Sequence, residues 1–217
     1  MKRINALMVA TAIFMSSCQD APNADNVSTT DEQATATVSG NSFVLDSTST
    51  IMWGGTKPDA THTGTFKIAA GTISVDNNQI TAGNISIDIA SLIDLDLEGE
   101  WKTKLEGHLK SPDFFDVEKF PTATFAITKV EDFDSTKVTS ILAGATHIIS
   151  GNLTLKDSTK NISFPAIVSI TENGLSAKAD FNIDRTLWGM NYKGPNNPAD
   201  WFIRKEVNLK FDLSAKK

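Results

Sequence analysis

Hydrophobic and polar residues alternate along most of the chain after residue 40. The alternation has a period of two, for example at Phe66 and Ile68 and over residues 207–213. A period of two places apolar side chains on one face of a strand and polar side chains on the other, as in antiparallel sheets that cover a core. Turn-forming residues separate these segments at 76–78, 157–159 and 172–174. The pattern therefore predicts an all-β domain of roughly eight to ten strands.

One segment follows a helical pattern instead. Leu97, Trp101, Leu105 and Leu109 recur at four-residue spacing, with charged residues between them. This spacing predicts a short amphipathic α-helix over about residues 97–110. The strands that surround it fit a closed barrel or a two-layer sandwich, because both have the same alternation.

Composition bears on what such a domain would enclose. The chain has 217 residues, among them 12 Phe, 4 Trp and a single Tyr, and its formal charge is −6. An acidic chain lacks the basic face that binds phosphates, which argues against a nucleic-acid partner. The inward positions are mainly Ile, Leu, Val and Phe. A barrel of about eight strands is just wide enough to be filled by side chains or to hold one slim ligand, so any cavity in it would be apolar.

The N-terminus resembles a bacterial lipoprotein signal. Lys2 and Arg3 precede an apolar stretch, and Cys18 is the only cysteine. The resemblance implies that residues 1–17 are a signal peptide and that Cys18 receives fatty acyl chains such as palmitate, which anchor the protein in a membrane. An ordinary secretory signal followed by an incidental cysteine is the alternative. We expect a lipid-anchored protein in the envelope of a Gram-negative bacterium, at the outer membrane.

The polar segment that follows predicts a linker. Residues 18–40 offer almost nothing apolar to bury, so we interpret them as the lipidated cysteine and a flexible tether. The domain itself is predicted over residues 41–217.

The sequence carries no recognisable catalytic motif, and we predict no catalytic residue and no enzyme activity. The histidines are His62, His108 and His147. None is paired with another at a spacing typical of metal ligands, so we also predict no metal site.

Five sequence blocks together resemble the YceI-like family of secreted bacterial proteins. They are His62–Phe66, His108–Asp116, Phe120–Phe125, Gly151–Leu155 and Asp184–Gly189, in this order. The resemblance implies a lipocalin-like antiparallel barrel of eight strands that binds a long isoprenoid chain, as in polyprenyl carriers and respiratory quinones. It also suggests a homodimer. No cofactor is expected other than a bound isoprenoid lipid or quinone.

Eleven residues are candidates to contact such a ligand, because they are inward-facing, aromatic or able to bind a headgroup. They are Phe66, Ile87, Trp101, His108, Phe114, Phe115, Phe125, Phe164, Phe181, Arg185 and Trp188. For the aromatic residues the alternative is plain core packing. For His108 it is a structural hydrogen bond, and for Arg185 it is an ion pair with the neighbouring Asp184.

Two kinds of function fit these observations. In the first, the protein binds, stores or transports an isoprenoid amphiphile in an apolar barrel. In the second, it is an enzyme or redox accessory that acts on such a lipid, or a stress-related structural lipoprotein of the envelope. The inward residues do not offer the polar cluster that catalysis would require, so the sequence favours binding.

Overall fold

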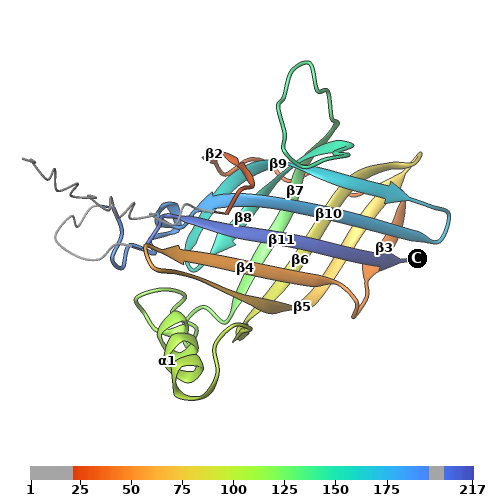
Figure 1. The fold of residues 1–217 in the computed structure, drawn as a ribbon. Coiled ribbons are helices and arrows are strands. Elements are labelled where there is room, and N and C mark those ends of the chain that lie inside the picture. Colours follow the sequence, from red (N-terminus) through yellow and green to blue (C-terminus); the bar gives the residue numbers. More distant parts are fainter. Residues whose placement is uncertain (1–21, 196–202) are drawn as a thin grey trace, which may run out of the picture.

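The computed structural model describes residues 22–195 and 203–217. Figure 1 shows a strongly curved antiparallel sheet, with one helix at one end. The elements in chain order are β1 (Asp25–Asn26), β2 (Ser28–Asp31), β3 (Asn41–Leu45), β4 (Thr50–Lys57), β5 (Ala60–Asp76), β6 (Gln79–Asp94), α1 (Gly99–Lys110), β7 (Thr122–Asp132), β8 (His147–Leu155), β9 (Ser158–Ile170), β10 (Gly174–Asp184), the 3-10 helix η1 (Arg185–Trp188) and β11 (Glu206–Lys216).

The sheet closes into a barrel of eight positions. Strands β5 to β11 pair antiparallel in sequence order, and β11 returns to pair with both β3 and β4. Strands β3 and β4 in turn both pair with β5, so together they fill one position. The predicted eight-stranded antiparallel barrel is confirmed, and closure excludes the sandwich.

The predicted turns lie between consecutive strands. Asn77 and Asn78 connect β5 to β6, and both have positive φ angles, 49° and 62°. This conformation suits a two-residue hairpin, and asparagine tolerates it better than most residues. The sequence therefore specifies this hairpin locally.

Helix α1 confirms the predicted helix and covers one end of the barrel (Figure 1). Leu105 and Leu109, in its second half, pack against the core. Trp101, in its first half, is 70% exposed. The apolar contacts of the helix with the barrel thus come from its C-terminal half, while Lys102 in its first half donates a hydrogen bond to the Asp94 carbonyl.

The N-terminal segment differs from the flexible tether that its composition predicts. Strands β9 and β10 pair with each other only over Ile167–Ile170 and Leu175–Lys178. Beyond that point β1 pairs with β10, and β2 pairs with β9. Where β9 and β10 diverge, their facing backbone N–H and C=O groups lose each other as partners. The backbone groups of β1 and β2 form hydrogen bonds with these strand edges instead. Cys18 and the predicted signal peptide lie outside the described residues.

A cluster of phenylalanines divides the barrel interior. Phe164 stacks on Phe181 with ring centroids 4.1 Å apart, and Phe125 and Phe211 contact this pair edge-on or tilted. A cavity of about 230 Å³ lies on the α1 side of the cluster, and one of about 30 Å³ lies on the other side. The cluster therefore separates a ligand-sized space from a small void.

Candidate functional site

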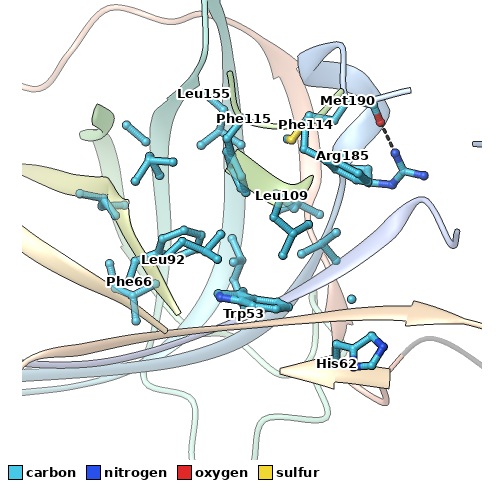
Figure 2. Close-up of a pocket in the computed structure, with 18 of the residues that line it drawn as sticks. Trp53, His62, Phe66, Leu92, Leu109, Phe114, Phe115, Leu155, Arg185 and Met190 are labelled. Carbon is cyan, nitrogen blue, oxygen red and sulfur yellow. Dashed lines mark hydrogen bonds between the residues drawn. The ribbon is translucent and has the colours of Figure 1, made fainter. Parts of the chain in front are cut away.

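The larger cavity is the candidate site. Its wall is formed by the ends of β4, β5 and β11 and by parts of β6, β8, α1 and the loop after α1. Most of the wall is aliphatic or aromatic, and Figure 2 shows Phe66, Leu92, Leu109 and Leu155 around the space. Such a wall favours an apolar ligand, because burying apolar surface contributes about 25 cal/mol per Å².

Two phenylalanines after α1 close one side of the cavity. The chain turns back at Ser111, whose carbonyl accepts hydrogen bonds from the backbone N–H groups of Phe114 and Asp116. This turn directs both Phe114 and Phe115 to the cavity wall. Phe115 meets Phe66 of β5 edge-on, with ring centroids 5.6 Å apart. The loop is thus fastened to the barrel by aromatic contacts.

Arg185 places a buried cation on this wall. The residue is 2% exposed, and its guanidinium donates to the backbone carbonyl groups of Met190, Tyr192, Ile203 and Arg204. Figure 2 shows the hydrogen bond to Met190. Burial lowers the pKa of the Arg185 guanidinium, while the charge of the nearby Asp184 carboxylate opposes this effect. The guanidinium lies 5.7 Å from the centre of the Phe114 ring, a cation–π contact.

The expected ion pair between Arg185 and Asp184 is not formed. The Asp184 carboxylate accepts hydrogen bonds from Thr186 N and Oγ1, at 3.0 and 2.6 Å, and from Lys205 Nζ at 2.9 Å. Successive residues at the end of an extended strand point to opposite sides. Asp184 therefore faces outward, while Arg185 faces the cavity and the loop after η1.

Trp53 contributes an unused hydrogen-bond donor. Its indole ring lines the cavity across from Phe114 and Phe115 in Figure 2. Its Nε1 is buried and has no hydrogen-bond partner in the part of the chain that the structure describes. A Cβ atom on Gly64 would lie 2.4 Å from this ring, so glycine there lets β5 approach Trp53 closely. An unpaired buried N–H costs free energy unless a ligand accepts it.

Two histidines lie on the cavity wall near its opening. The His62 side chain is 19% exposed and the His108 side chain 37%, so the cavity reaches the surface beside them. His108 Nε2 lies 3.1 Å from Asp113 Oδ2, and its ring meets the Tyr192 ring edge-on at 4.6 Å. His108 thereby joins the end of α1 to the loop that follows η1.

Six of the eleven predicted residues line this cavity. They are Phe66, Ile87, His108, Phe114, Phe115 and Arg185. Phe125 and Phe164 line the smaller cavity instead, and Phe181 lies in the phenylalanine cluster between the two. Trp188 is buried and donates from Nε1 to the Leu153 carbonyl, at 3.0 Å. Trp101 points to solvent, against Lys104.

The candidate list missed Trp53, His62 and Leu92 on the wall. Trp53 alternates in phase with Ile51, which was a usable signal for an inward position. His62 precedes Gly64 and Phe66 at the start of a strand, which is compatible with its lining the same opening as His108, but alternation does not give its height along the barrel axis. Among residues 22–195 and 203–217, no helix is long and apolar enough to cross a membrane.

Comparison with known proteins places the chain in a family. Residues 43–215 match the model of the YceI-like domain. A UPF0312 protein of Photorhabdus laumondii is 29% identical over 155 residues, which cover 70% of this chain and 66% of that protein. A UPF0312 protein of Vibrio vulnificus is 34% identical over 103 residues, 48% of each chain, so this chain spans about half the length of that relative.

Solved structures share the fold. BcnA of Burkholderia cenocepacia matches with a TM-score of 0.62 at 19% identity, over 79% of this chain and 99% of that one. A polyisoprenoid binding domain from Saccharophagus degradans matches with a TM-score of 0.58 at 17% identity, over 80% of this chain and 97% of that one. With the closed barrel and the match over residues 43–215, these findings show that the chain belongs to the YceI-like domain family.

Proposed function

We propose that the protein binds a long-chain isoprenoid amphiphile, such as a polyprenyl or quinone lipid, and stores or carries it at the bacterial envelope. The observation that carries the proposal is the apolar cavity of about 230 Å³. The polyisoprenoid binding named for the Saccharophagus degradans domain supports the same class of ligand.

The polar groups on the wall suggest how such a ligand is oriented. In a mostly apolar wall, Trp53 Nε1 is a donor without a partner among the described residues, the Arg185 guanidinium is a buried cation, and His62 and His108 add imidazoles near the opening. A lipid with a hydrogen-bond acceptor, such as a quinone carbonyl or a phosphate oxygen, matches these donors better than a plain hydrocarbon. We propose that the polar end of the ligand lies between Trp53 and Arg185, which face each other across the cavity (Figure 2), and that the isoprenoid chain runs toward the phenylalanine cluster.

The cavity volume limits how much of the lipid fits. Ligand pockets usually measure about 300–1,000 Å³, and this cavity measures about 230 Å³. A long chain therefore requires that side chains move or that part of the lipid stays outside. Each buried methylene contributes about 0.8 kcal/mol in the cavity, and a similar amount in a bilayer. Exchange with a membrane is then nearly balanced, which suits a carrier rather than an enzyme.

Anchoring would place the barrel beside its ligand. We propose that acyl chains on Cys18 hold the protein at the outer membrane, and that residues 41–217 form the binding domain. A homodimer is part of the same proposal.

The test is mass spectrometry of the organic extract from residues 19–217, which lack the lipidated cysteine, purified from a bacterial periplasm without detergent. We expect one equivalent of a polyprenyl or quinone lipid. A cavity-filling substitution, Ala123→Leu, should reduce the bound lipid at least fivefold, because Ala123 is buried on the cavity wall.

The matched control is Ala166→Leu, because Ala166 is equally buried but lines only the smaller cavity. Its lipid content should match that of the wild type, with thermal unfolding confirming that both variants are folded. An empty wild-type protein that also fails to take up added quinone and polyprenyl phosphate would contradict the proposal.

A further inference from the structure

Three metal-ligating side chains meet at the rim of the barrel. His62 lies on β5, Asp94 is the last residue of β6, and Asp96 follows it in the loop to α1. One ligand atom from each of the three lies within 4.8 Å of the other two. His62 Nδ1 and Asp96 Oδ2 are 2.8 Å apart. The sequence gives no hint of this cluster, since residues 62 and 94 become neighbours only through the antiparallel pairing of β5 with β6.

Asp94 has an unsatisfied carboxylate oxygen. The residue is 0% exposed, and its Oδ1 accepts from the backbone N–H groups of Asp96 and Leu97, at 3.2 and 2.7 Å. Its Oδ2 is buried and has no hydrogen-bond partner among the described residues. A buried carboxylate oxygen without a partner is costly, so the protein gains stability if a cation binds it.

The charges around the cluster also favour a cation. Lys102 Nζ donates to the main-chain carbonyl of Asp94 at 2.6 Å, and Glu106 accepts the Asp94 N–H at 2.8 Å. The carboxylates of Asp94, Asp96 and Glu106 and the ammonium of Lys102 together carry a formal charge of −2.

We propose that His62 Nδ1 and the carboxylates of Asp94 and Asp96 bind one divalent transition-metal ion of the zinc class. An imidazole with two carboxylates is a donor set that suits zinc or manganese. The ion takes the place of the hydrogen bond between His62 Nδ1 and Asp96 Oδ2, and it neutralises the excess negative charge. Three protein ligands leave a coordination position for water.

Such an ion would connect three parts of the structure. It joins β5, the end of β6 and the segment that leads into α1, whose residues Leu105, His108 and Leu109 line the cavity. His62 lines that cavity as well as belonging to the cluster. The bound ion therefore stabilises the rim beside the cavity, and this conclusion stands whether or not the cavity binds a lipid.

The test is calorimetric titration of the chain with zinc chloride, after treatment with a chelator. The sample is prepared without a polyhistidine tag, and any free thiol at Cys18 is alkylated, because both would bind zinc themselves. We expect one equivalent of zinc to bind and to raise the thermal unfolding temperature. His62→Gln and Asp94→Asn should each weaken binding at least tenfold and abolish the thermal shift.

The matched control is His147→Gln. The His147 side chain is 22% exposed, close to the 19% of His62, and it lies 3.9 Å from Asp132, but it is outside the three-residue cluster. This variant should bind zinc as the wild type does. If Asp94→Asn does not fold, His62→Gln decides the outcome. Absence of zinc binding in the wild type, or equal binding in His62→Gln, would overturn the proposal.

Discussion

Trp53 and Arg185 show how single polar side chains adjust an apolar cavity. Arg185 uses its donors mainly on backbone carbonyl groups, and so holds the loop after η1 against the barrel. The Trp53 N–H makes no such structural hydrogen bond, because Nε1 has no hydrogen-bond partner among the described residues. The two donors therefore differ in role: one shapes the wall, and the other is free to contact a ligand.

Trp53→Phe tests this difference, on the basis of the proposed function. The change keeps an aromatic ring and removes only the indole N–H and part of the ring volume. We expect affinity for a quinone to fall about fivefold to tenfold, the usual worth of one hydrogen bond. The affinity for a hydrocarbon of equal chain length should change much less. Both affinities are measured by displacement of a fluorescent lipid whose signal does not depend on tryptophan. Equal losses for both ligands would show that the N–H is not used.

Asp184 gives a prediction about pH. Burial raises the pKa of its carboxyl, but hydrogen bonds from Thr186 and Lys205 outweigh this and hold the pKa below its ordinary value. The ionised form is therefore favoured by folding. Its contribution is fully present above pH about 4, near the pKa of the unfolded chain, and is lost as pH falls through the folded value.

Urea unfolding of Asp184→Asn should show this dependence. At pH 7 the variant should be less stable than the wild type by about 1 kcal/mol, since Lys205 is partly exposed and its ion pair is screened. As the pH is lowered from about 4 toward 2 the difference should shrink, because the Asp184 carboxylate becomes protonated. A difference that stays constant over the whole range would contradict the assignment.

At the scale of elements, the N-terminal segment completes the barrel wall. Asn152 on β8 accepts the Gln33 N–H at 3.1 Å and donates to the Gln33 carbonyl at 2.7 Å. Asn182 on β10 likewise donates to the carbonyl groups of Pro22 and Ala24, at 2.9 and 3.3 Å. Side-chain amides of the barrel thus bind the backbone of this segment, and its polar composition does not prevent it from being ordered.

Asn152→Ala should release this segment. The change removes both hydrogen bonds to Gln33 and the buried one that Asn161 Nδ2 donates to Asn152 Oδ1, so we expect a loss of about 1–3 kcal/mol in unfolding free energy. Hydrogen exchange should become faster for the amides of residues 28–36 first. Asn84→Ala, at an exposed position of β6, is the control and should change neither quantity. Unchanged exchange in Asn152→Ala would mean that pairing with β9 alone holds the segment.

At the scale of the whole molecule, the phenylalanine cluster sets the depth of the cavity. Phe211 lines both cavities, whereas Phe125 lines only the smaller one. The barrel is therefore one apolar channel interrupted by aromatic rings, rather than two independent spaces.

Phe211→Ala should join the two cavities. We expect the free energy of unfolding to fall by about 3 kcal/mol. On the proposed function, the lipid extracted from this variant should also have a longer chain than the lipid extracted from the wild type. Phe125→Ala is the control, with a similar loss of stability and no change in chain length. If both variants retain lipids of the same length, the cluster does not determine ligand size.

Much of the barrel could be predicted because its causes are local. Alternation with a period of two identifies strands and their inward faces, and residues such as Asn77 and Asn78 identify the turns. The helix follows from the spacing of Leu105 and Leu109. Its outer residue Trp101 was misplaced, because four-residue spacing defines a face but not how much of that face meets the barrel.

The sequence by itself determined the strands, the turns, the helix and the apolar character of the interior, since these depend on neighbouring residues. Only the tertiary structure decided which inward residues share a cavity, because height along the barrel axis depends on strand register. Closure likewise decided that the N-terminal segment pairs with β9 and β10. It also brought His62 beside Asp94 and Asp96, which are distant in sequence and joined only by antiparallel pairing.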